Sequence, residues 1–198
     1  MRRSAFPIGT VLGGVLAAQA ALAQSLPPSN ASGGIVAQSR APLGTTPAEI
    51  QADSKTFAMQ MALGDLFEIE SSNLALERSR NNDIKAFARM TAQDHAKSTE
   101  QLKDAYMKSA FPEPLPSHLD QSHAQNLARL RDLSGAEFDH AYMLAQLEAH
   151  QRAVSLLQEQ SQKGDKPMLK QFAGTVLPTV HKHLSDAQRL ATPMSAAR

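Results

Sequence analysis

The chain has 198 residues, a formal net charge of +1 and a hydrophobic fraction of 42%. This length and composition suit one globular domain with a sizeable core. The nearly balanced charge and the absence of tryptophan argue against nucleic acid as a partner. Because the sequence contains no cysteine, disulfide bonds and thiolate chemistry are excluded.

The first 23 residues have the pattern of a bacterial secretory signal peptide. Arg2 and Arg3 form a basic start, residues 8–20 are mostly apolar, and Ala21 and Ala23 supply an A-x-A cleavage site. The apolar segment is short and interrupted by glycines, so an uncleaved membrane anchor is the weaker alternative. We therefore expect cleavage after Ala23, no membrane span in the mature protein, and a periplasmic or secreted location.

Residues 24–46 are rich in proline, glycine and serine without periodicity, which predicts a disordered leader. A helix start follows, because Thr46 can act as the N-cap, Pro47 suits the first helical position, and Glu49 completes a capping box. Apolar residues then recur at helical spacing, so we expect the first helix to extend to about Ser79.

The remaining chain predicts three more long helices and a short one. The second long helix is expected from about residue 84 to 109, where a proline-rich segment stops it, and a short helix follows at 118–133. An S-x-x-E capping box at Ser134 opens the third long helix, which ends at Gly164. The last is expected at 165–190, with a kink at Pro178.

No segment alternates with period two for long enough to form a strand. The sequence therefore predicts an all-α four-helix bundle made of two antiparallel hairpins, with a short extra helix in the crossover. We expect this bundle to occupy residues 47–191 and to be followed by a flexible tail at 192–198.

Each predicted long helix places one ionisable side chain on its apolar face. These side chains are Glu68, His95, His150 and His183. Their heights along the bundle also agree, since Glu68 and His95 each lie about 13 residues from the turn between their helices. We therefore expect the four side chains to meet in the core.

Three imidazoles and a carboxylate in an apolar core require a partner. A single transition metal ion, Zn, Fe, Mn or Cu, would supply one, with Asp94 and Gln146 as candidates for orienting the histidines. The alternative is a metal-free network of the same side chains that fixes helix register in a non-enzymatic helical interaction module. The sequence assigns no catalytic residue and no protein partner.

Several short motifs resemble a bacterial exported family catalogued as domain of unknown function 4142. They are G-x-x-x-E at Gly64 and Glu68, D-H at Asp94 and His95, F-D-x-x-Y from Phe138 to Tyr142, and L-P-x-x-x-x-H-L from Leu177 to Leu184. The resemblance covers about residues 57–190 and implies a ferritin-like bundle, but no established activity. We expect metal binding, with a role in the cell envelope under stress.

Ferritin-like architecture raises the question of a di-iron site, which requires two E-x-x-H motifs and further carboxylates. The residues three positions before the inward-facing histidines are Ala92, Leu147 and Val180, all apolar. The sequence therefore does not predict a carboxylate di-iron site. Another departure is Ala149, where the family commonly has aspartate before the histidine.

Overall fold

The computed structural model describes residues 53–196, and the predicted signal peptide, leader and first capping box lie outside them. This part of the chain contains five α-helices and no strand, which confirms the all-α prediction. The helices are α1 (Ser54–Arg78), α2 (Asn82–Lys108), α3 (Gln121–Arg131), α4 (Gly135–Lys163) and α5 (Pro167–Ala196).

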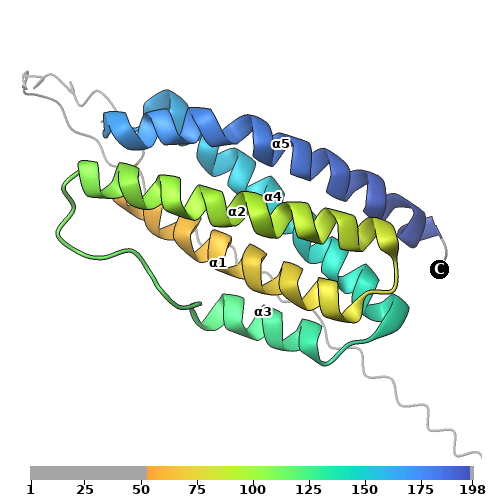
Figure 1. Ribbon diagram of the computed structural model, residues 1–198. Helices are drawn as coiled ribbons and strands as arrows, with labels where there is room; N and C mark the ends of the chain where they lie inside the picture. Colours follow the sequence, from red (N-terminus) through yellow and green to blue (C-terminus); the bar gives the residue numbers. More distant parts are fainter. Residues whose placement is uncertain (1–52, 197–198) are drawn as a thin grey trace, which may run out of the picture. The chain divides into compact units, whose positions relative to one another are not determined.

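The four long helices pack as two antiparallel hairpins, α1 with α2 and α4 with α5 (Figure 1). The hairpins associate through α2 against α5 and α1 against α4, so each long helix contacts two others. The short helix α3 lies in the long connection between α2 and α4 and packs mainly against the outer side of α1. This arrangement confirms the predicted helical bundle and its crossover helix.

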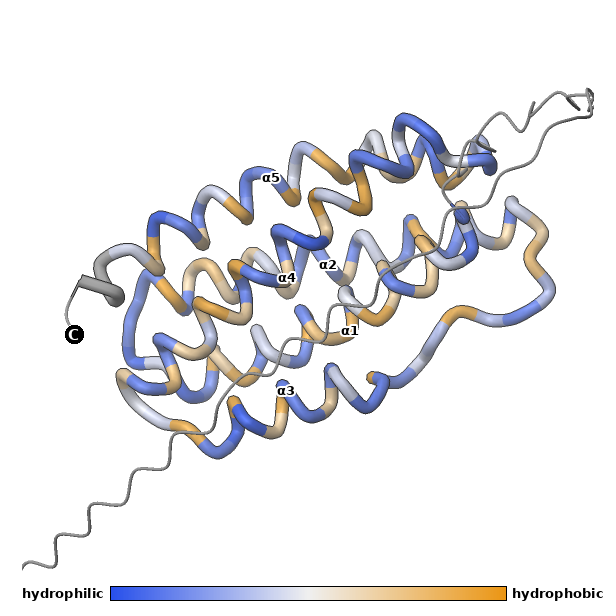
Figure 2. The backbone as a smooth tube through the Cα atoms, turned by 180° about the vertical axis from the view of Figure 1, so that it is seen from behind, coloured by the Kyte–Doolittle hydropathy of each residue, from blue (hydrophilic) through white to orange (hydrophobic). Residues whose placement is uncertain are grey.

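Apolar side chains fill the two ends of the bundle as separate clusters. One contains Phe57, Leu102, Leu157 and Phe172, and the other contains Ile84, Phe87, Phe138 and Tyr142. The hydropathy of the backbone trace alternates along each helix, as expected where one side is buried and the other is solvated (Figure 2). Between the two clusters, each long helix contributes buried polar residues.

Side-chain caps determine where several helices begin. The side chain of Asp53 accepts a hydrogen bond from the backbone N–H of Lys55 at the start of α1, whereas the predicted helix start at Pro47 lies outside the described residues. Ser134 is the N-cap of α4, as predicted, but its side chain makes no capping bond. The next residue, Gly135, has a left-handed φ of +56°, which departs from a regular helix start.

The C-terminal helix extends further than its sequence pattern predicts. Helix α5 continues through Pro178 and ends at Ala196, beyond the expected end near residue 190, so most of the predicted flexible tail is helical. Its proline lacks a backbone N–H, which leaves the carbonyl of Gly174 without its usual helical donor. The bundle tolerates this loss because Gly174 lies on the exposed side of α5.

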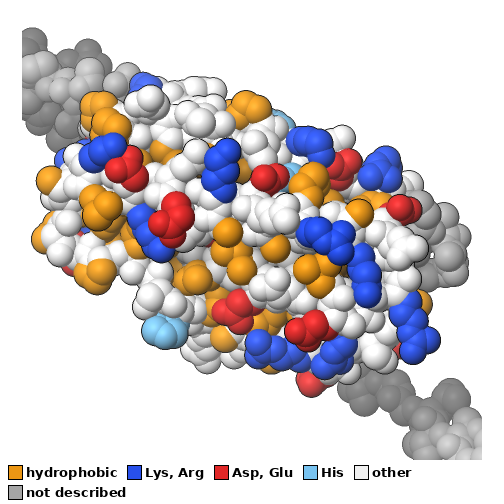
Figure 3. Space-filling model, in the orientation of Figure 1, with side chains coloured by type: hydrophobic (Ala, Val, Ile, Leu, Met, Phe, Trp, Pro, Cys, Tyr) orange, Lys and Arg blue, Asp and Glu red, His pale blue; other side chains and the backbone are white. Residues whose placement is uncertain are grey.

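The surface shown in Figure 3 carries lysine and arginine side chains interspersed with aspartate and glutamate. Charged side chains one helical turn apart also form exposed pairs, including Lys103 with Glu100 and Lys108 with Asp104. Such exposed pairs contribute little to stability but keep a helix face soluble.

Candidate metal centre

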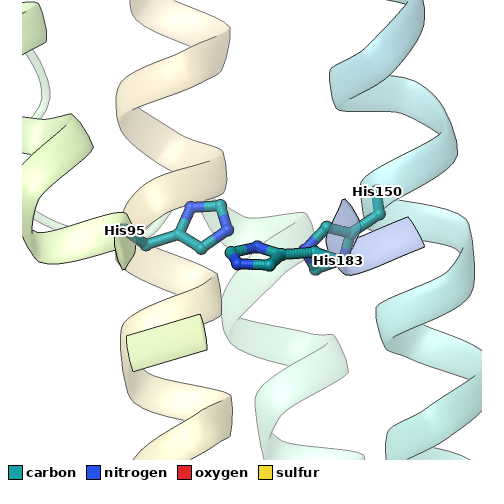
Figure 4. A group of neighbouring side chains, drawn as sticks. All are labelled: His95, His150 and His183. Atoms are coloured by element: carbon teal, nitrogen blue, oxygen red, sulfur yellow. The ribbon is translucent and has the colours of Figure 1, made fainter. Parts of the chain in front are cut away.

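The polar layer between the two apolar clusters contains three histidines from three different helices. His95 comes from α2, His150 from α4 and His183 from α5, and all three are buried. One ring nitrogen of each lies within 4.8 Å of the others (Figure 4). The structure therefore brings together three of the four side chains predicted to meet.

In each imidazole, one nitrogen is hydrogen-bonded to another group of the protein. Nδ1 of His95 lies 2.7 Å from a carboxylate oxygen of Asp65, and Nε2 of His183 lies 2.9 Å from one of Asp94. Because an ionised carboxylate only accepts, these ring nitrogens carry the proton and donate.

His150 is held differently, since its Nδ1 donates to the backbone carbonyl of Gln146 at 2.8 Å, one turn earlier on α4. The nitrogens left over are Nε2 of His95, Nε2 of His150 and Nδ1 of His183, and none has a hydrogen-bond partner. In its neutral form each ring therefore keeps its lone pair on the nitrogen that the protein does not use.

Aromatic packing restricts the orientation of the three imidazole rings. The three imidazole centroids lie 5.4–5.7 Å apart, and the ring of Phe87 packs against His150 at 6.2 Å and against His183 at 6.4 Å. Phe87 belongs to the apolar cluster on that side of the layer, so it closes the layer there.

Glu68 on α1 lies beside this cluster but outside the group of mutually close ligand atoms. Its side chain is 3% exposed, and neither carboxylate oxygen has a hydrogen-bond partner. One oxygen lies 3.9 Å from Nδ1 of His150. Burial raises the pKa of Glu68 to about 7, because the interior disfavours the charged form.

The three histidines differ in their affinity for protons. Burial lowers the pKa of His150 to about 3, and it also lowers the pKa of His183. Burial acts in the same direction on His95, but the hydrogen bond and charge of Asp65, with the charges of Glu68 and Asp94, raise its pKa above the usual value. At neutral pH, His150 and His183 are therefore neutral donors with a free lone pair.

A groove connects the polar layer with the surface. It has a volume of about 840 Å³ and runs between α1 and α4, with residues of α3 along one side. Glu68, His95 and His150 line its inner part, whereas His183 does not line it. The site is thus buried within the bundle but accessible from one side.

Sequence reasoning found four of the buried ionisable side chains in this layer and missed one. Asp65 is 1% exposed and holds His95, yet the periodicity of the first helix did not single it out. Its position three residues before Glu68 places both carboxylates on the same side of α1, and that spacing was the available signal. Of the two suggested orienting groups, Asp94 uses its side chain and Gln146 its backbone carbonyl.

The fold and the site define an all-α bundle with three buried histidines at its centre that could hold a metal ion. The chain belongs to the family described as a domain of unknown function (DUF4142), whose model matches residues 39–190. This match confirms the resemblance found in the sequence motifs. A comparison with curated proteins found no match.

Solved structures share the fold at low sequence identity. CopM in its Cu(II)-bound form is 17% identical with a TM-score of 0.61, over 73% of this chain and 99% of that one. A secreted DUF305 protein from Streptomyces coelicolor is 16% identical with a TM-score of 0.60, over 73% and 93% of the two chains. CopM in a silver-bound form is also similar, with 17% identity, a TM-score of 0.59 and coverage of 72% and 98%. Within residues 53–196, no helix is both long and apolar enough to cross a membrane.

Proposed function

We propose that this protein binds a single transition metal ion in its core through His95, His150 and His183, with Glu68 completing the coordination. The observation that carries the proposal is the set of partnerless nitrogens, one on each ring. In each imidazole the other nitrogen is held by Asp65, Asp94 or a backbone carbonyl, as in metal sites where an outer group orients the ligand.

The spacing suits a metal after a small contraction. With metal–nitrogen bonds of about 2.0–2.1 Å, tetrahedral ligand nitrogens lie about 3.4 Å apart. One nitrogen of each ring already lies within 4.8 Å of the others, so loading requires small ring movements and no rearrangement of helices. Glu68 supplies the negative charge that offsets that of the cation, and its two free oxygens give it a ligand atom to offer.

A metal-free network explains the same residues less well. Buried polar atoms in a structural network find hydrogen-bond partners, because an unpartnered one costs about 1–3 kcal/mol. Here one nitrogen on each ring and both oxygens of Glu68 remain without a partner. A ligand shared by all of them removes this cost at once.

The donor set points to a borderline or moderately hard divalent ion. Imidazole nitrogen and carboxylate oxygen suit zinc, copper, iron and manganese, and among divalent ions of this row Cu²⁺ generally binds most tightly. Solved bundles of similar fold include CopM bound to Cu(II) and to silver, which supports copper as the first metal to test.

We also propose that the protein is exported by a signal peptide cleaved after Ala23 and acts in the periplasm or outside the cell. The similar fold of a secreted DUF305 protein is consistent with this location. Metal binding there would protect the envelope under stress. Mass spectrometry of the protein from a periplasmic fraction tests the cleavage site, and a mature chain that retains residues 1–23 would contradict it.

The deciding experiment is elemental analysis of the mature chain, residues 24–198, purified without an affinity tag. We expect close to one equivalent of metal in the wild type and none in the His95→Ala/His150→Ala variant. The control is His118→Ala/His181→Ala, which removes two exposed histidines and should keep the metal. Absence of metal in the wild type, with no rise in melting temperature on adding zinc, iron, manganese or copper, would refute the proposal.

A further inference from the structure

We infer that the metal ion enters and leaves the core through the groove between α1 and α4, and that Gly64 keeps this route open. The inference rests on the proposed function, because it concerns access to the same site. It adds a specific path, a residue that controls the rate, and an order in which the ligands meet the ion.

A route is required because the ligands are almost completely buried, with His95, His150 and His183 at 4%, 1% and 0% exposure. The apolar clusters block both ends of the bundle, and Phe87 packs over two of the rings on one side. The α1–α4 groove, by contrast, reaches Glu68, His95 and His150 directly.

Gly64 lies on the groove wall, one helical turn before Glu68. A glycine inside a helix costs about 1 kcal/mol relative to alanine. Close helix packing does not require the glycine here, because a Cβ added to Gly64 would meet no atom within 4 Å. The missing side chain instead leaves open space along the path to Glu68.

The opposite wall of the groove, on α4, includes larger residues such as Leu144 and Leu156 and four alanines at one-turn spacing. The alanines are Ala141, Ala145, Ala149 and Ala153. At these positions Gly64 and the alanines leave space for an ion that still carries part of its hydration shell.

The groove also sets the order of coordination. Glu148 lines the groove from the exposed face of α4, and Glu68 lies at its inner end with two partnerless oxygens. Asp120, His123, Arg129 and Arg152 also line the groove, so its outer part carries charges of both signs. An entering cation then reaches Glu68, His95 and His150, which line the inner part. His183 does not line the groove, so it binds the ion last.

The test compares Gly64→Leu with the matched control Gly174→Leu, using the full mature chain and Cu(II) as the probe. Gly174 is also a helix-interior glycine with open space around its Cβ, but it lies on α5 away from the groove. Stopped-flow absorption measures loading, and transfer to excess chelator measures release. A second variant that fills the groove, Ala145→Leu, narrows it from the α4 side.

We expect Gly64→Leu and Ala145→Leu to slow loading and release by the same factor, about tenfold, which corresponds to about 1.4 kcal/mol on the barrier. The dissociation constant stays unchanged, because a blocked path affects both directions equally. Gly174→Leu should behave as the wild type. Wild-type rates in both Gly64→Leu and Ala145→Leu, or a change in the release rate alone, would contradict entry through this groove. A wild-type protein that binds no Cu(II) would overturn the proposed function and the route together.

Discussion

Asp65 and His95 form a buried ion pair across the α1–α2 hairpin, with Nδ1 of the imidazole 2.7 Å from the carboxylate oxygen. Their side chains are 1% and 5% exposed, so solvent does not screen the contact. The second carboxylate oxygen accepts from the hydroxyl of Thr99 at 3.3 Å, which orients Asp65 in turn. The pair therefore fixes both the tautomer and the direction of His95.

This relationship predicts unequal effects of two carboxylate substitutions. Asp65→Asn keeps an acceptor for Nδ1 of His95 but removes the charge, so we expect metal affinity to fall about 10–100-fold. Asp94→Asn should lower metal affinity only a few-fold, because Asp94 is 41% exposed and solvent already weakens its interaction with His183. Competition with a chelator of known affinity measures the metal affinity of both variants.

The same experiment needs circular dichroism and melting curves for each variant, since removing a buried partner also destabilises the fold. A larger loss of affinity for Asp94→Asn than for Asp65→Asn would contradict the argument from burial.

Metal affinity should rise with pH. A metal binds the deprotonated imidazole, and the pKa of His95 is raised, chiefly because Asp65 outweighs the effect of burial. Below that raised pKa, binding must displace a proton from His95, and below about pH 7 it must also displace one from Glu68. The logarithm of the affinity should therefore gain about one for each pH unit where one of these groups is protonated and about two where both are, and it should level off above both pKa values. His150 adds no such dependence near neutrality, because its pKa is about 3.

Asp65→Asn provides the check, because it removes the main cause of the raised pKa of His95. The pH at which affinity levels off should therefore move downward in this variant. Calorimetry in two buffers of different ionisation enthalpy counts the protons released. An identical pH profile in both proteins would show that another group controls the dependence.

The sequence was sufficient to predict the helices and the inward direction of the four ionisable side chains. Helical periodicity places a residue on a face to within a fraction of a turn, and the rise per residue places it along the axis. Together they predict that His95, His150 and His183 lie at one level of the bundle, as the structure confirms. Prolines, glycines and polar caps between the periodic segments separated the helices.

Asp65 escaped prediction because the buried side of α1 is unusually polar. That helix buries Ser54, Glu68, Ser71 and Ser72 as well, so apolar periodicity locates its inner side only roughly. The contacts of Glu68 could not be predicted either, since they depend on helix rotation and side-chain rotamers, which one sequence does not specify.

Two helix caps predict a difference in stability that is independent of the metal site. The side chain of Asn81 accepts from the backbone N–H groups of Asp83 and Ile84, at 2.9 and 3.4 Å. Asn81→Ala should therefore lower the free energy of unfolding by about 1 kcal/mol. Ser134→Ala should cost only a few tenths of a kcal/mol, because the Ser134 side chain makes no capping bond. Urea denaturation of the metal-free protein measures both, and equal losses would contradict the cap assignment.

The final prediction concerns Glu68, whose role reverses between the metal-free and loaded proteins. Its pKa is about 7 in the folded protein, against 4.5 as the ordinary value, so the folded state binds the extra proton between these limits. The associated stability is fully present below pH 4.5 and is lost as pH rises through 7. Glu68→Gln has no proton to lose. The metal-free variant should match the wild type at pH 4.5 and exceed it by about 3 kcal/mol at pH 8.

With metal present the order should invert, because Glu68→Gln removes a charged ligand while the wild type gains stability from binding. Thermal melts at pH 4.5 and pH 8, each with and without Cu(II), separate the two effects in one set of samples. The expected pattern at pH 8 is a higher melting temperature for Glu68→Gln without metal and a lower one with it. If the variant is more stable than the wild type with metal as well, Glu68 is not a ligand, and its burial beside His150 requires another explanation.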